Sequence, residues 1–149
     1  MGARPKIRID FARRTSRRLP RELIIAIVRD ILRRAGRPWE VSIAVVGDDE
    51  IAELNKRYLR KSRPTDVLAF RLDDETEPRG AGQIVISADT AAREAVERGI
   101  PFRHEIALYA AHAALHLLGH PDATEKDREE MARLEAEALA RFGIPRHGD

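Results

Sequence analysis

The stretch EIALYAAHAALHLL, residues 105–118, decides the fold. It is apolar nearly all round, and a helix of that composition is buried on most of its sides. Gly119, Pro121 and Asp122 follow it and end it. We therefore predict a central buried helix around which the rest of the chain packs.

Short apolar or alternating segments before this helix predict the strands of a sheet. The segments are IRIDF at 7–11, VSIAV at 41–45, VLAF at 67–70 and IVI at 84–86. Apolar residues at helical spacing predict further helices. These helices span about 20–35, 48–58, 88–98 and 124–142.

The chain shows no internal repeat and no linker, so we predict one α+β domain over residues 1–149. It is a single compact domain in which a sheet of about four strands packs with helices around the buried helix. Residues 73–82 are acidic and contain Pro78, Gly80 and Gly82, which predicts a mobile loop. His147 lies in a polar tail, which we expect to be disordered.

Composition excludes several classes of protein. The 149 residues include no cysteine, which rules out disulfide frameworks, zinc fingers, thiol catalysis and iron–sulfur clusters. Any metal site must therefore use His, Asp or Glu. No apolar run approaches about 18 residues, so no membrane span is predicted. The first residues lack the apolar core of a signal peptide, and we expect a cytoplasmic protein.

The near-zero net charge hides an asymmetry. Residues 1–72 carry 18 Lys and Arg against 9 Asp and Glu, whereas residues 73–149 carry 9 against 16. A basic half can face the phosphates of a nucleic acid. A GC-rich genome alone would also favour Arg, which outnumbers Lys 23 to 4. Charge alone leaves both interpretations open.

Three of the five histidines, His112, His116 and His120, lie within nine residues. His112 and His116 are four residues apart and share one face of the predicted helix. Imidazoles in a buried helix need partners, because burial of an unpaired polar group is costly. The pair is either satisfied by carboxylates and backbone groups or bound to a metal.

The residues after the pair favour the metal. Gly119 can end the helix, so the chain can fold back and bring Asp122 close to the two histidines. His120 lies within this stretch and is a rival third ligand. Two histidines and a carboxylate, with one open position, form a common catalytic zinc arrangement. We predict one Zn²⁺ held by His112 and His116 of the buried helix and by a third ligand after it, Asp122 or its rival His120.

A zinc site with an open position predicts hydrolysis. A peptidase of the His-Glu-x-x-His type needs Glu directly after the first histidine, where this chain has Ala113. Phosphodiester cleavage relies more on neutralising charge at phosphate, which a metal and Arg supply. The basic first half agrees with that reaction better than with peptide hydrolysis.

Three ordered motifs resemble the YbeY family. HAALHLLGHPD at 112–122 resembles His-Gly-x-Leu-His-Leu-x-Gly-Tyr-Asp-His. LNKRYLRKSRPTDVLAF at 54–70 resembles Leu-Asn-x-x-Tyr-Arg-x-Lys-x-x-x-Thr-Asp-Val-Leu-Ser-Phe, and GQIVIS at 82–87 resembles Gly-Asp-Ile-Val-Ile-Ser. Their order and spacing agree with the family from about residue 51 to 131.

The resemblance implies a single α+β domain and a zinc-dependent endoribonuclease that acts on single-stranded RNA. It further implies a role in ribosomal RNA processing, notably at the 3′ end of small-subunit rRNA, and in ribosome quality control. The implied partners are single-stranded RNA and rRNA or the ribosome, and the lack of a long apolar run predicts no membrane partner.

By position, His112 and His116 match the first two zinc ligands of the family. Asp122 stands where the family has its third histidine, and His120 where it often has Tyr. The Arg that follows the motif Tyr in the family is Leu59 here, with Arg60 one place on. Arg60 is thus a weak candidate for a catalytic contact with phosphate.

Arg60, Lys61 and Arg63 are the candidate RNA-binding residues of the second motif, and the resemblance identifies no general base. Asp66 matches the family motif but is equally explained as a cap at the start of a strand.

A second hypothesis belongs to a different class. Leu59 and Asp122 depart from the family pattern and favour a non-catalytic ribosome-assembly or RNA-binding factor with a structural metal. A structural site is closed by four protein ligands, whereas a catalytic one keeps a position open.

Overall fold

The computed structural model describes residues 4–59, 66–74 and 76–148. The strands in these ranges are β1 (Ile7–Arg14), β2 (Trp39–Val46), β3 (Val67–Arg71) and β4 (Gly80–Ser87). The helices are α1 (Arg21–Arg34), α2 (Asp48–Leu59), α3 (Ala88–Arg98), α4 (Phe102–Leu117) and α5 (Glu125–Ala140). Each predicted strand and helix is present, and the single α+β domain is confirmed.

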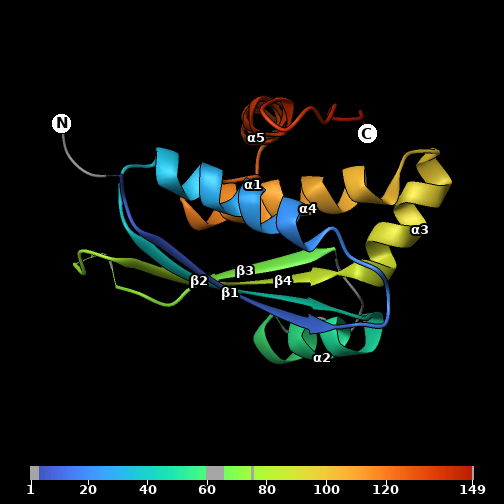
Figure 1. Ribbon diagram of the computed structural model, residues 1–149, viewed down its shortest axis with the longest axis horizontal. Coiled ribbons are helices and arrows are strands. Elements are labelled where there is room, and N and C mark those ends of the chain that lie inside the picture. Colours follow the sequence, from blue (N-terminus) through green and yellow to red (C-terminus); the bar gives the residue numbers. More distant parts are fainter. Residues whose placement is uncertain (1–3, 60–65, 75, 149) are drawn as a thin grey trace.

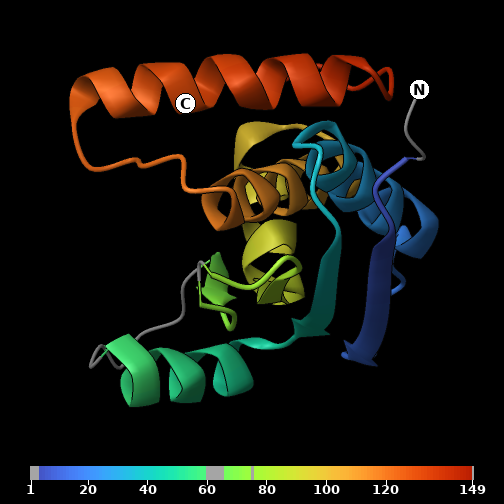
Figure 2. The same ribbon diagram turned by 90° about the vertical axis from the view of Figure 1, so that its left-hand side faces the viewer.

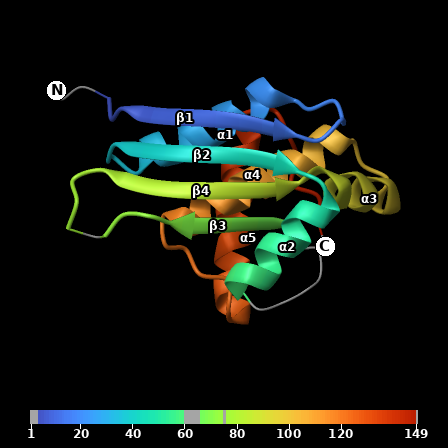
Figure 3. The ribbon, with the colours of Figure 1, turned by 90° about the horizontal axis from the view of Figure 1, so that it is seen from below.

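The strands form one mixed sheet in the order β1-β2-β4-β3 (Figure 3). β1, β2 and β4 run parallel, whereas β3 pairs with β4 in the antiparallel direction and forms an edge of the sheet. In this register Val41 of β2 lies opposite Gly82 of β4, and Leu68 of β3 lies opposite Val85. The edge strand β3 is the one that adjoins the predicted site.

The helices cover the sheet unequally (Figures 1 and 2). α1 and α4 lie on one face of the sheet, and α5 crosses their outer side. α2 lies alone on the other face, where Ile51 packs into a small apolar cluster with Val46 and Leu68. The main core therefore lies between the sheet and the pair α1 and α4.

Helix α4 is the buried helix that the sequence predicts. Ten of its sixteen residues are buried, and it contacts α1, α3, α5, β3 and β4. Small side chains such as Ala110 and Ala114 let these elements approach closely. Glu105 is also buried, where it pairs with Arg98 at 2.9 Å.

Although α4 is apolar, none of the helices that the structure describes is long and apolar enough to cross a membrane.

A glycine in β4 sets how closely α4 approaches the sheet. A Cβ atom on Gly82 would lie 2.8 Å from Cδ2 of Leu117 and 3.2 Å from the carbonyl oxygen of Phe70. Leu117 is fully buried at the end of α4, so it has little room to move. The absence of a side chain at Gly82 is therefore a condition for the position of the C-terminal half of α4.

The segment 73–82, predicted as a mobile loop, is fastened at its start, and its last residues belong to β4. The buried carboxylate of Asp73 accepts hydrogen bonds from Arg71 at 2.7 Å, from Arg37 at 3.1 Å and from the backbone N–H of Ala81 at 3.1 Å. These contacts hold the pKa of Asp73 far below its usual value, with the Arg71 hydrogen bond as the largest cause. The prediction of a loop is wrong for residues 80–82, which belong to β4, and the contact with Arg37, 36 residues before Asp73, is not visible in the composition of the segment.

The C-terminal tail is also ordered, in contrast to our expectation for His147. Ile144 is buried, and the ring of His147 stacks on His104 with its Nε2 3.0 Å from His104 Nδ1. Arg98 of α3 donates to the carbonyl oxygens of His147 and Gly148. The tail is thereby tied to α3 and to the start of α4.

Replacement of Gly82 by Ala is expected to lower the free energy of unfolding by about 1–3 kcal/mol, because the added methyl overpacks the contact with Leu117. Gly148→Ala is the matched control, since a Cβ there meets no atom within 4 Å. Urea unfolding of both variants checks this. Equal stability of the two variants would show that α4 does not depend on this close approach.

Candidate functional site

The two histidines predicted as ligands lie one turn apart on the last turns of α4. Their rings are nearly parallel, with an interplanar angle of 10° and centroids 6.3 Å apart. The His112 side chain is 29% exposed, whereas His116 is exposed. His112 is therefore the ring that the surrounding structure holds in place, and His116 lies at the edge of the site.

The turn after α4 brings Asp122 back to His112. Gly119 adopts a φ of +97°, a left-handed conformation that suits glycine, and its N–H donates to the carbonyl of His116 at 2.9 Å. The chain then reverses, and Oδ2 of Asp122 lies 3.4 Å from Nε2 of His112. The predicted return of the chain at Gly119 is confirmed.

His120, the rival third ligand, lies elsewhere. It lines a separate pocket between α1, α4 and α5 together with Leu118 and Leu134. Asp122, in contrast, lines two adjoining pockets with His112, and His116 lines one of them. The structure thus brings His112, His116 and Asp122 to one place and separates His120 from them.

These two adjoining pockets form what we call the histidine groove. They share Asp66, Val67, His112 and Asp122, so the groove runs between α4, the start of β3 and the turn into α5. Asp66 begins β3 by accepting a hydrogen bond from the backbone N–H of Val67 at 2.8 Å. Asp66 is therefore both the predicted cap and a residue of the groove. The groove is also lined by Tyr109, Arg128 and Arg146.

A carboxylate that the sequence did not reveal contacts His112 at Nδ1, the ring nitrogen that does not face Asp122. Oε2 of Glu135, on α5, lies 2.8 Å from Nδ1 of His112, and Glu135 is only 3% exposed. Oε1 of the same carboxylate accepts a hydrogen bond from Nε of Arg146 at 2.9 Å. The hydrogen bond that His112 donates to Glu135 raises the pKa of His112, with smaller contributions from the charges of Asp66 and Asp122.

The predicted zinc can be tested against this geometry. Two donor atoms held tetrahedrally at about 2.0–2.1 Å from zinc lie about 3.3 Å apart. The 3.4 Å between His112 Nε2 and Asp122 Oδ2 agrees with that spacing. In addition, a ligating histidine commonly donates its other ring N–H to a carboxylate, as His112 does to Glu135.

The third ligand is not in place. Among the residues that the structure describes, no three His, Asp or Glu side chains form a cluster that could hold a metal ion. His116 lines the same groove and is exposed, so rotation about its side-chain torsions is needed to close the site. The spacing of His112 Nε2 and Asp122 Oδ2 therefore fits a metal, whereas His116 does not complete the site in this conformation.

The candidate RNA-binding residues Arg60, Lys61 and Arg63 lie outside the described residues. A second group of arginines, at positions 13, 14 and 17, has partners within the molecule. Arg13 donates to backbone carbonyls of residues 15–17, Arg14 pairs with Glu50 at 2.6 Å, and Arg17 pairs with Asp89 at 2.8 Å. These three arginines thus have structural partners.

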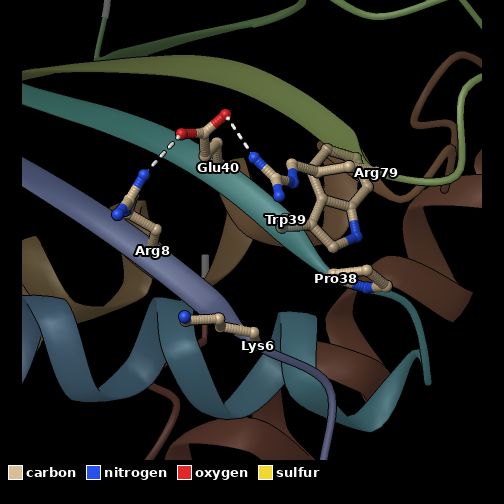
Figure 4. A pocket seen from close by; sticks show the side chains of 6 residues that line it. All are labelled: Lys6, Arg8, Pro38, Trp39, Glu40 and Arg79. Atoms are coloured by element: carbon tan, nitrogen blue, oxygen red, sulfur yellow. Dashed lines mark hydrogen bonds and ion pairs between the residues drawn. The ribbon is translucent and has the colours of Figure 1, made fainter.

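A further small pocket lies beside Trp39, at the N-terminal ends of β1 and β2 (Figure 4). Its rim is closed by Glu40, which pairs with Arg8 at 3.3 Å and with Arg79 at 3.2 Å. These exposed ion pairs engage Arg8, Arg79 and Glu40 with one another, and the pocket contains none of the predicted site residues. The histidine groove is therefore the better candidate for chemistry.

The comparisons with known proteins agree with the sequence motifs. A family model described as endoribonuclease YbeY matches residues 9–143. The chain is 39% identical over 124 residues to the endoribonuclease YbeY of Carboxydothermus hydrogenoformans, with 83% of this chain and 87% of that protein covered. It is 38% identical over 117 residues to the endoribonuclease YbeY of Bacillus subtilis, with 72% and 74% covered.

A solved structure shares the fold. The solution structure of a protein from Thermotoga maritima matches with a TM-score of 0.62 and 24% identity, over 92% of this chain and 91% of that one. The mixed sheet, the buried α4 and the histidine groove define an α+β protein with a histidine-bearing helix at its centre. The family match then places it: the chain belongs to the YbeY family.

The contact with Glu135 fixes the position of the proton on neutral His112. A carboxylate can only accept, so Nδ1 must carry the proton and Nε2, which faces Asp122, must present its lone pair. We expect long-range ¹H–¹⁵N spectra of the metal-free protein, recorded above the pKa of His112, to show the Nδ1–H tautomer. A spectrum of the Nε2–H tautomer would contradict the hydrogen bond to Glu135.

Proposed function

We propose that the chain is a zinc-dependent endoribonuclease that cleaves single-stranded RNA, and that the histidine groove is its active site. The observation that carries the proposal is the convergence of His112 Nε2 and Asp122 Oδ2, 3.4 Å apart, in a groove that His116 also lines. The relatives named endoribonuclease YbeY support the reaction class.

In this proposal His112, His116 and Asp122 hold the metal. When bound, zinc would polarise a phosphoryl oxygen and increase the acidity of a nearby water molecule. With Asp122 in place of a third imidazole, the ligand set carries one more negative charge. We expect this charge to make the metal a weaker Lewis acid or to change the metal preference.

The surroundings of the groove suit a phosphodiester. Arg128 lines it, and a guanidinium group suits the oxygens of a phosphate. Residues 60–63 follow α2 in the sequence, and we propose that Arg60, Lys61 and Arg63 contribute further contacts to RNA. Two nucleophiles are compatible with this arrangement: a water molecule, or the 2′-hydroxyl of the RNA itself.

The cellular role rests on the motifs. We propose that the enzyme acts in the cytoplasm on ribosomal RNA, notably at the 3′ end of small-subunit rRNA, and in ribosome quality control. The Asp at position 122 favours one alternative, a ribosome-assembly or RNA-binding factor with a structural metal. A zinc ion with four protein ligands would support that alternative, because it leaves no open position for chemistry.

Cleavage of a labelled single-stranded RNA tests the activity. We expect His116→Ala, purified in the same way as wild type, to lose bound zinc and to cleave at least about 100-fold more slowly, the scale of losing a principal electrostatic stabiliser. The same RNA annealed to its complement is the control substrate and should resist. Mass analysis of the product ends separates the nucleophiles, because attack by the 2′-hydroxyl leaves a cyclic phosphate.

Equal cleavage by wild type and His116→Ala would assign the activity to a contaminating nuclease. A zinc-loaded wild-type protein that leaves single-stranded RNA intact would contradict the enzymatic proposal and favour the assembly factor.

A further inference from the structure

We propose that Glu135 and Arg146 form a positioning pair that sets the tautomer of His112 and thereby the zinc affinity of the site. This inference rests on the proposed function, since it concerns the same metal. Glu135 lies 23 residues after His112 on α5, and Arg146 follows in the C-terminal tail. Neither residue belongs to the predicted ligand set.

The carboxylate of Glu135 is buried and is engaged at both oxygens. Glu135 is 3% exposed, and burial of a charge is tolerated when it is paired and hydrogen-bonded. Each of its oxygens faces a different donor, Oε2 the Nδ1 of His112 at 2.8 Å and Oε1 the Nε of Arg146 at 2.9 Å. The carboxylate therefore bridges the tail and the groove.

The chemistry of the three groups fixes the direction of each hydrogen bond. The guanidinium of Arg146 can only donate, and the carboxylate of Glu135 can only accept. His112 must then donate from Nδ1, so that its Nε2 lone pair points toward Asp122 and the groove. The positioning pair thus fixes the nitrogen that is offered to a metal.

Contacts of the neighbouring residues hold Arg146 in place. Ile144, two residues before it, is buried, and its N–H donates to the carbonyl of Leu139 at 3.0 Å. On the other side, Arg98 donates to the carbonyl of His147 at 3.1 Å. The tail is therefore anchored before and after Arg146, and its side chain is only 17% exposed.

The positioning pair predicts that Glu135→Gln changes the tautomer of His112. A glutamine has one acceptor oxygen, and Arg146 requires it, so the amide NH₂ group would face Nδ1 of His112. His112 would then accept at Nδ1 and carry its proton on Nε2, where a metal cannot bind. A second replacement, Arg146→Met, would release the amide oxygen to accept from Nδ1 and would restore the original tautomer.

The test measures the zinc dissociation constant of the full chain by competition with a chromophoric chelator, together with the His112 tautomer by NMR and the unfolding free energy without metal. We expect Glu135→Gln to bind zinc about 10–100-fold more weakly, the usual effect of losing an outer-shell carboxylate. Its spectrum should show Nε2–H. The double variant Glu135→Gln, Arg146→Met should regain much of the affinity and the Nδ1–H tautomer.

Glu137→Gln is the matched control. Glu137 lies on the same helix but is exposed, where it pairs with Arg133 at 2.6 Å. The replacement removes the same charge from the same helix, two residues after Glu135. Zinc affinity should change by less than about twofold. A similar loss in both variants would assign the effect to net charge and overturn the positioning role.

The remaining outcomes separate the inference from the proposed function. If wild type binds zinc and Glu135→Gln binds it equally well, the inference is wrong and the proposed metal site stands. If the double variant binds as weakly as Glu135→Gln, Arg146 does not orient the amide and the pair is refuted. Wild type that fails to bind zinc overturns both. An Nε2–H tautomer in wild type overturns the inference without any variant, even if Glu135→Gln fails to fold.

Discussion

The packing of α4 between the sheet and the outer helices constrains every part of the site. A helix in contact with five other elements needs small side chains on several faces, and its buried alanines supply them. The sheet contributes Gly82, where a side chain would collide with Leu117. Because α4 is fixed on so many sides, His112 and His116 emerge at one defined place, between the edge strand β3 and the turn into α5.

This constraint explains why the polar partners of the site come from distant segments. α4 is packed on most sides, and the carboxylates that reach His112 come from outside the helix. Asp122 reaches it through the turn at Gly119, and Glu135 reaches it from α5. The carboxylates lie on opposite nitrogens of one imidazole. One of them is exposed and faces the groove, while the other is buried behind the ring.

Much of this arrangement follows from local sequence patterns. The apolar run at 105–118 predicted the buried helix, the spacing of His112 and His116 predicted a shared face, and Gly119 predicted the return of the chain. Each of these signals lies within about a dozen residues, where helix geometry fixes spatial relations. The role of these residues as metal ligands remains a proposal, and so do the roles of Arg60, Lys61 and Arg63.

Other features could not be predicted from the sequence alone, because they depend on contacts between distant segments. Nothing around Glu135 distinguishes it from the exposed acids of α5, and only the crossing of α5 over α4 brings it to His112. Arg146 and His147 lie in a segment of polar composition, and the contacts that order it come from Arg98 and His104. The order of the strands is likewise set by packing rather than by any strand's own pattern.

The most direct test of the metal site is anomalous diffraction at the zinc edge from crystals of the zinc-loaded full chain. The account predicts a single strong peak in the histidine groove, about 2.0–2.2 Å from Nε2 of His112, from a ring nitrogen of His116 and from a carboxylate oxygen of Asp122. A fourth position should be open to solvent. A peak held by His120 instead of Asp122 would overturn the ligand assignment, and a groove without a peak would contradict the account itself.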